Sequence, residues 1–282
     1  RARVYTRARQ TIEQKLAARH LREDALVLYD QSSSYFEGSS CPLAKRGYSR
    51  DGRPGTLQVN YGLLTDARGC PVAVSVFEGN TSDSLTFLPA VQRVRERFGL
   101  AQVVMVGDRG MVSQKAIDEL RGQGGIDWIT ALKSVSIRSL VEQGHLQLGL
   151  FDQRNLAEIT SPDYPGERLV ACRNDALAKL RAHKRESLLQ ATEALLTVIK
   201  ASVDAGRLAG QDKIGVQVGK IINRHKVAKH FELTIGEATL AWARRQDAID
   251  AEAALDGLYV IRTSLDAKRM DAPSCVRSYK AL

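Results

Sequence analysis

The sequence contains no long apolar run. No stretch of its 282 residues approaches the roughly 18 consecutive apolar residues of a membrane-spanning helix. It begins Arg1-Ala2-Arg3-Val4, without an initiator Met and without the apolar segment of a signal peptide. We therefore expect a cytoplasmic protein with no membrane partner. We also expect this sequence to be a fragment, or a processed product, of a longer chain.

Cysteine is scarce and widely scattered. The four cysteines, Cys41, Cys70, Cys172 and Cys275, form no Cys-x-x-Cys pair, and the five histidines provide no zinc-ligand spacing around them. Free thiols in a reducing cytosol are the default expectation for such a pattern. The spacing therefore predicts no zinc site.

A nucleotide-binding loop is also missing, because the glycines at residues 122–125 follow a predicted helix and not a strand. The hydrophobic content of 44% is that of a packed globular protein, and the length allows one large domain with an insertion or two domains. The net charge of +9, from 41 Lys and Arg against 32 Asp and Glu, favours a polyanionic partner. Many soluble proteins are basic without binding a polyanion, so the net charge alone does not establish a nucleic-acid partner.

Two apolar, strand-like runs each end in an aspartate. Residues 25–29 lead into Asp30, and residues 103–107 lead into Asp108. Because the end of a strand projects a carboxylate from a rigid edge, two such edges side by side can hold a divalent cation between their oxygens. This pair is the best indication of function in the sequence.

The order of predicted elements around the two aspartates indicates an α/β core with a mixed sheet. The expected elements are a surface helix at 3–22, a strand at 25–30, a short extended piece at 31–38, a basic loop at 39–55, a hairpin of strands 56–64 and 71–77, a helix ending near residue 99, a strand at 103–107, a helix from 113 to about 120, and a strand at 128–133.

The character of the sequence changes after Lys133. Residues 134–170 are mixed and polar, a long helix with a solvated, charged face is expected from residue 174 to about 203, and strand-like pieces return after it. We predict four parts: a helical lead-in at 1–24, the first part of the core with both aspartates at 25–133, an insertion subdomain at 134–255, and a return to the core at 256–282.

Several separate motifs resemble the DDE transposases of bacterial insertion sequences, whose catalytic core is RNase H-like. The matching stretches are residues 29–37, 43–53, 69–72, 77–81, 106–111 and 256–263. The resemblance is dense over residues 25–133 and from 256 onward, and thin between. It implies a transposase fold: an RNase H-like mixed sheet flanked by helices, with a large insertion.

By this resemblance, Asp30 is the first catalytic acid and Asp108 the second. It implies two Mg²⁺ ions, or Mn²⁺ in their place, held by both aspartates. The implied reaction is metal-dependent cleavage that frees a 3′-hydroxyl at the element's end, followed by transfer to target DNA. The implied partners are the element ends and the target DNA, with a homo-oligomer assembled on the DNA in the nucleoid.

The third acid of this family is a Glu on a helix after the final strand. Here the sequence runs Tyr279-Lys280-Ala281-Leu282 and stops, so we expect that Glu a few residues beyond, and an inactive site in this truncated sequence. Within the sequence we give no catalytic weight to several other acids, and we assign Asp66 to a turn and Asp83 to a helix cap. The others are Glu37, Glu78, Asp250 and Glu252.

The basic loop and one further arginine are the predicted DNA contacts, because charges and a tyrosine cluster there without apolar neighbours. They are Lys45, Arg46, Tyr48, Arg50, Arg53 and Arg109. A solvated loop, and a salt bridge of Arg109 to a nearby acid, are the competing interpretations. Two other functions stay open: an RNase H-like nuclease, and a non-catalytic DNA-binding remnant of a truncated element.

Overall fold

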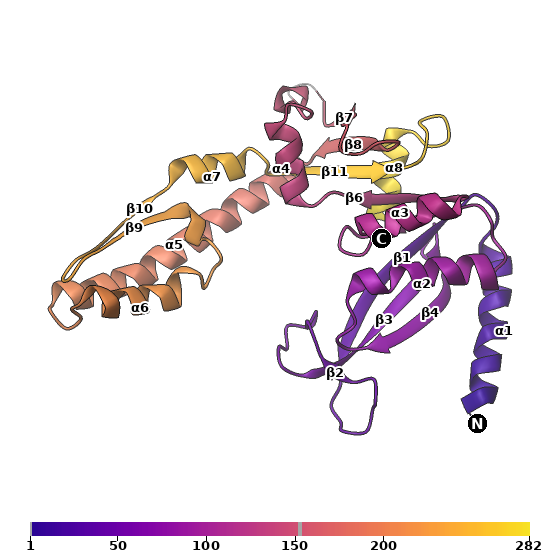
Figure 1. Cartoon of the computed structure of the whole chain (residues 1–282), viewed down its shortest axis with the longest axis horizontal. Coiled ribbons are helices and arrows are strands. Elements are labelled where there is room, and N and C mark those ends of the chain that lie inside the picture. Colours follow the sequence, from indigo (N-terminus) through magenta and orange to yellow (C-terminus); the bar gives the residue numbers. More distant parts are fainter. Residues whose placement is uncertain (1, 152–153) are drawn as a thin grey trace. The chain divides into compact units, whose positions relative to one another are not determined.

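The chain forms two compact units in a computed structural model that describes residues 2–151 and 154–282 (Figure 1). The first, here called the sheet unit, contains the chain up to Ala171 together with Tyr259–Leu282. The second, the helical unit, is Cys172–Leu258. Residue 1 of the predicted lead-in and residues 152–153 of the predicted insertion lie outside the described residues.

Within the described residues, nine strands form one large sheet. Their order is β2-β3-β1-β5-β6-β11-β8-β7, and β4 pairs with the outer side of β3. The strands are β1 (Ala25–Tyr35), β2 (Lys45–Arg46), β3 (Leu57–Asp66), β4 (Pro71–Glu78), β5 (Val103–Gly107), β6 (Ile126–Ala131), β7 (Leu156–Ile159), β8 (Arg168–Arg173) and β11 (Leu258–Thr263).

The sheet is mixed. β1 runs antiparallel to β3 and parallel to β5, β5 runs parallel to β6, and β11 runs antiparallel to β6. The predicted hairpin is present as β3 and β4. An antiparallel meander followed by parallel crossovers through helices is the RNase H-like arrangement, so the predicted fold class is confirmed.

Helices cover the sheet because their apolar side chains recur at helical spacing. Fully buried residues of α2 and α3, such as Phe87 and Ile117, join Tyr29 and Met105 of the strands in one cluster, to which Ala17 and Leu21 near the end of α1 also belong. The helices of this unit are α1 (Ala2–His20), α2 (Phe87–Gln92), α3 (Gln114–Gln123), α4 (Ser134–Glu142) and α8 (Ala272–Lys280), with 3₁₀ turns η1 (Asp83–Leu85) and η3 (Leu148–Phe151) and a π-helical turn η2 (Arg93–Arg97).

The predicted end of the first strand is wrong. β1 does not stop at Asp30 but continues to Tyr35, because β3 pairs along its whole second half, down to Tyr35 opposite Gln58. This half has polar side chains that are nevertheless buried, among them Gln31, whose Oε1 accepts a 2.9 Å hydrogen bond from Thr86. The alternation of apolar and polar residues that marks a strand in a sequence is therefore absent from the second half of β1, and the sequence did not show that the strand continues. The loop predicted at 39–55 likewise contains the short strand β2.

The predicted start of the insertion also differs from the structure. Residues 134–171 belong to the sheet unit, where β8 and β7 extend the sheet beyond β11. A buried ion pair helps to hold this part in place: Arg262 of β11 donates two hydrogen bonds to Glu167, which also accepts one from Arg121. Within this region a buried charge, Glu167, stands where a sequence pattern would expect an apolar residue.

The helical unit is built around the long predicted helix. α5 (Asp175–Asp204) begins at Asn174, whose Oδ1 caps it by accepting from the N–H of Leu177. Its apolar stripe packs against the other elements of the unit, which are α6 (Gln211–Ile222), η4 (Ala228–His230), the hairpin of β9 (Phe231–Ile235) and β10 (Leu240–Arg244), and α7 (Gln246–Ala253). Trp242 lies on β10 and packs against the buried cluster of this unit. None of the described helices is long and apolar enough to cross a membrane.

Packing inside the sheet unit requires a glycine at position 62, beside the Tyr29 side chain. A Cβ atom at Gly62 would lie 2.2 Å from the Oη of Tyr29, whose side chain is fully buried against Phe87. The Gly62→Ala variant should therefore lose about 1–3 kcal/mol of unfolding free energy through overpacking, measured by urea denaturation. Gly122→Ala is the control: it lies on α3 with no atom within 4 Å of the added Cβ. Equal stability of the two variants would contradict this packing.

Candidate active site

Two aspartates lie side by side because β1 and β5 pair in parallel. The last paired residues of this ladder are Tyr29 and Gly107, and Asp30 and Asp108 each follow directly. Neighbouring strands lie about 4.8 Å apart. At this point β5 ends, while β1 continues along β3. Both aspartates therefore lie where the pairing between β1 and β5 ends, and no strand of the described residues covers this edge of β1 beyond them.

The electrostatic environment disfavours a charged Asp30. Partial loss of hydration raises the pKa of the Asp30 carboxyl group, although the residue as a whole is exposed at the surface. The negative charges of Asp108 and Asp83 raise this pKa further. The N–H of Gln31, which donates to Oδ1 at 2.8 Å, and the charge of Arg50 lower it, and the net effect is a raised pKa. A cation at this carboxylate would therefore relieve an existing repulsion.

Asp108 is held in a fixed orientation through both of its oxygens. Oδ1 accepts a 2.9 Å hydrogen bond from the Oη of Tyr279 on α8, and Oδ2 accepts one of 3.1 Å from the N–H of Gly110. Burial raises the pKa of the Tyr279 phenol, and the charge of Asp108 and this hydrogen bond raise it further. The phenol therefore stays protonated at neutral pH and remains a donor to Asp108.

Asp30 opens onto a hollow of about 280 Å³ on the face of the sheet where its side chain projects. Polar groups of Ser32, Tyr61 and Thr65 line it together with the chain at Ala281 and Leu282. The polar side chains that line this hollow beside Asp30 therefore all offer oxygen atoms, from one carboxylate and three hydroxyl groups. This donor set fits a hard divalent cation such as Mg²⁺ or Mn²⁺, which prefers carboxylate, carbonyl and water oxygens.

Asp83 is a third acid near this pair that the sequence assigned to another role. Ser82 occupies the N-cap of the 3₁₀ turn without a side-chain cap, and Asp83 instead forms an ion pair with Arg50 of the basic loop. The predicted cap role of Asp83 is therefore wrong. No spacing in the sequence connects Asp83 to Asp30, because the effect of the Asp83 charge on Asp30 depends on how the chain folds back. The turn role of Asp66 is confirmed: its Oδ1 accepts from the N–H groups of Arg68 and Cys70.

The structure separates the residues of the basic loop into two kinds. Arg50 is paired with Asp83, and Arg53 lies 4.0 Å above the Tyr35 ring and 3.5 Å from Glu37. By contrast, Lys45 and Arg46 are exposed on β2 and form no ion pair among the residues that the structure describes.

Gln58 is one of several residues that fasten the loop, and the loop is exposed beside this contact. Gln58 donates from Nε2 to the carbonyl oxygens of Tyr48, at 2.9 Å, and Gly79, at 2.7 Å. The Tyr48 side chain itself is 83% exposed. Arg109 follows Asp108 directly, is exposed, and has no salt bridge within the described part of the chain, so the competing salt-bridge interpretation is not supported.

An RNase H-like sheet with neighbouring aspartates on two parallel strands defines the class: it is the core expected of a DDE transposase. The family described as Transposase DDE domain matches residues 22–280. The chain belongs to this family. Comparison with curated proteins gives no match.

Among solved structures, the chain is similar to a piggyBac transposase synaptic complex with hairpin DNA, with 13% identity and a TM-score of 0.37 over 54% of this chain and 31% of that chain. It is also similar to a Mos1 transposase paired-end complex with the left transposon end, with 13% identity and a TM-score of 0.26 over 47% of this chain and 42% of that chain. A Mos1 mariner paired-end complex with Mn is similar with 17% identity and a TM-score of 0.24, over 52% of this chain and 50% of that chain. The chain thus spans half or less of the length of these transposases.

The raised pKa of Asp30 has a measurable consequence without metal. Its charged form destabilises the folded chain above this pKa, whereas its protonated form does not, so stability contributed by Asp30 is lost as pH rises through the raised pKa. In EDTA at pH 7 we expect Asp30→Asn to raise Tm by about 1–2 °C, and the gain to vanish as pH falls below the ordinary Asp range. Asp163→Asn, on an exposed turn, is the control. A gain that grows on acidification would contradict the electrostatic assignment.

Proposed function

We propose that the protein is a transposase that uses Asp30 and Asp108 to cleave DNA at the ends of an insertion sequence and to transfer the freed 3′-hydroxyl to target DNA. The placement of these two aspartates at adjacent ends of the β1–β5 ladder carries the proposal. It is supported by membership of the DDE family over nearly the whole chain. The native assembly is proposed to be a homo-oligomer on DNA.

Asp30 and Asp108 would hold the divalent metal, Mg²⁺ or Mn²⁺, as two ions. When bound, such ions generate the nucleophile and stabilise the charge that develops on the attacked and departing oxygens of a phosphodiester. The chain's own contribution is orientation. Tyr279 and the N–H of Gly110 fix the Asp108 carboxylate, and the Gln31 N–H fixes one oxygen of Asp30.

The exposed cations would position DNA. Lys45 and Arg46 are available for phosphate contacts because no acid in the described residues pairs with them, and Tyr48 offers an exposed ring on which a base can stack. Arg109 lies next to Asp108 and is proposed to contact the phosphate that is cleaved. Arg50 and Arg53, which have partners within the chain, are proposed to shape the loop and to contact DNA only secondarily.

The helical unit is proposed to be the insertion of the transposase core. Its chain leaves the sheet after β8 and returns to it at β11, and these two strands are neighbours in the sheet. An insertion between adjacent strands leaves the order of β1, β5 and β6 intact, and with it the two strands that position Asp30 and Asp108.

The catalytic assignment predicts a separation of cleavage from binding. In the full-length protein with Mg²⁺, Asp30→Ala and Asp108→Ala should reduce cleavage of element-end DNA to background, because each removes a carboxylate of the metal site. DNA affinity should stay within about twofold, since neither residue supplies a positive charge. Asp163→Ala is the matched control. Substantial cleavage by either active-site variant would exclude the assignment. DNA binding by the wild type without cleavage in Mg²⁺ or Mn²⁺ would favour the non-catalytic remnant.

The DNA-contact assignment predicts a change in salt dependence. Removing both charges with Lys45→Ala/Arg46→Ala should weaken DNA binding and lower the slope of log K against log salt by about 2, close to 1 for each lost phosphate contact. Lys115→Ala, an exposed lysine on α3, is expected to leave the slope nearly unchanged. Equal slopes for wild type and double variant, measured by fluorescence anisotropy, would remove this loop from the interface.

A further inference from the structure

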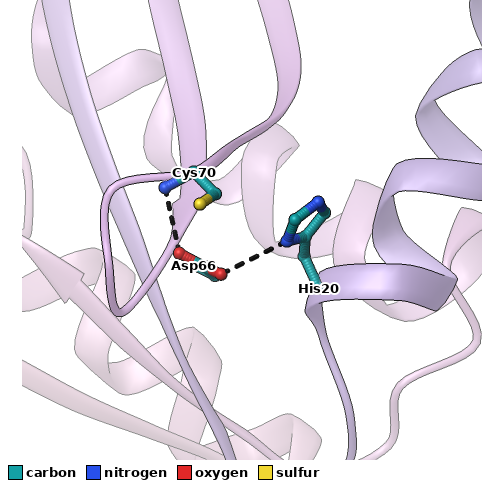
Figure 2. A group of neighbouring side chains, drawn as sticks. All are labelled: His20, Asp66 and Cys70. Carbon is teal, nitrogen blue, oxygen red and sulfur yellow. Dashed lines mark hydrogen bonds and ion pairs between the residues drawn. The ribbon is translucent and has the colours of Figure 1, made fainter.

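A second group of metal-ligating side chains lies in the sheet unit, away from the aspartate pair. His20 at the end of α1 faces the β3–β4 turn, which carries Asp66 and Cys70 (Figure 2). One ligand atom from each of the three residues lies within 4.8 Å of the others. The sequence showed no zinc-ligand spacing around its cysteines because the packing of α1 creates this group: Ala17 of α1, and Leu21 directly after its last residue His20, are buried in the core cluster.

This group is separate from the proposed catalytic site. Asp66 pairs with Val27 in the β1–β3 register, three residues, or about 10 Å along the strand, from Asp30. Because side chains alternate between the faces of a sheet, Asp66 projects on the same face as Val27 and Asp30 projects on the opposite one.

The turn holds one oxygen of Asp66 and directs the other toward His20. Oδ1 accepts hydrogen bonds of 2.9 Å from the N–H groups of both Arg68 and Cys70, and Gly69, with φ of 79°, allows the chain to turn back tightly. Oδ2 lies 3.5 Å from the Nδ1 of His20. Two nitrogen or oxygen ligands of a tetrahedral zinc ion are separated by roughly 3.4 Å, so this pair already has the required spacing.

A cationic group already occupies the point between these two atoms. The Nη2 of Arg68 lies 2.7 Å from Asp66 Oδ2 and 3.2 Å from His20 Nδ1. Since a guanidinium group can only donate, this contact is a hydrogen bond when Nδ1 presents its lone pair, which is the form of histidine that binds a metal. The Arg68 side chain is 71% exposed, so it can leave this position into solvent.

Both oxygens of Asp66 are fully used as acceptors. Oδ2 accepts from the Nε and Nη2 of Arg68, and Oδ1 accepts from the N–H groups of Arg68 and Cys70. His20, Asp66 and Arg68 also line an open hollow of about 590 Å³, which gives an ion access from solvent.

We infer that His20, Asp66 and Cys70 form a site for a borderline-soft divalent cation of the Zn²⁺ class, in which the ion exchanges with the Arg68 guanidinium. The donors are His20 Nδ1, Asp66 Oδ2 and Cys70 Sγ, and water from the hollow completes a four-coordinate shell. The Cys70 thiol loses its proton to solvent as it binds, and the metal takes over the charge neutralisation that Arg68 provides. The bound ion fastens the end of α1 to the β3–β4 turn.

The donor set can be tested with Co²⁺ and Zn²⁺ alone on the full-length protein. Co²⁺ should produce a thiolate-to-metal absorption band, which the oxygen donors of Asp30 and Asp108 cannot give. The band should persist in Cys41→Ser, which removes another partly buried free thiol, and disappear in Cys70→Ser. Zn²⁺ should abolish the band and should raise Tm more in the wild type than in Cys70→Ser, which keeps only the carboxylate site at Asp30 and Asp108. Persistence of the band in Cys70→Ser would overturn the site.

Arg68→Ala distinguishes a metal site from a turn that Arg68 merely closes. Removing the competing guanidinium should strengthen Co²⁺ binding at least about tenfold, and His20→Ala in that background should reverse the gain by a comparable factor. A turn without metal function would lose stability in Arg68→Ala and show no thiolate band. Absence of the band from both wild type and Arg68→Ala would therefore refute the proposal.

Discussion

The parallel pairing of β1 with β5 is the constraint on which the candidate active site depends. The last paired residues of this ladder are Tyr29 and Gly107. The next residue on each side is an aspartate, Asp30 after Tyr29 and Asp108 after Gly107, so the two carboxylates are neighbours at the point where the pairing ends. Two carboxylates at neighbouring strand positions repel each other, and the pKa of Asp30 rises through lost hydration and the charge of Asp108. The buried cluster around Tyr29, Met105 and Phe87 holds both strands in register against this repulsion.

The sequence predicted these strands because their apolar runs are continuous and short, as in strands buried on both faces. It failed where burial involves polar groups. The second half of β1 contains Gln31 and Ser33, which are buried although polar, and the region before β8 contains Glu167, whose charge is neutralised by Arg262. Periodicity detects apolar burial only. The sequence therefore divided β1 into a strand and a separate extended piece, and it did not predict β7 and β8.

Contacts between residues far apart in the chain also could not be predicted from the sequence pattern. Nothing in the spacing places Tyr279 on Asp108, Asp83 on Arg50, or His20 beside Cys70. Each contact arises only when a helix or loop packs on the finished sheet. The structure therefore divides the six predicted DNA contacts into arginines with partners inside the chain, Arg50 and Arg53, and the other four, which retain exposed side chains.

The shared use of Asp30 and Asp108 by one divalent site is tested most directly by Mn²⁺ binding to the full-length protein, followed by electron paramagnetic resonance. A Cys70→Ser background removes the thiolate of the His20 group from the measurement. If both carboxylates bind metal, Asp30→Asn and Asp108→Asn will each weaken Mn²⁺ binding by at least about tenfold. Unchanged Mn²⁺ affinity in either variant would contradict a shared site between β1 and β5.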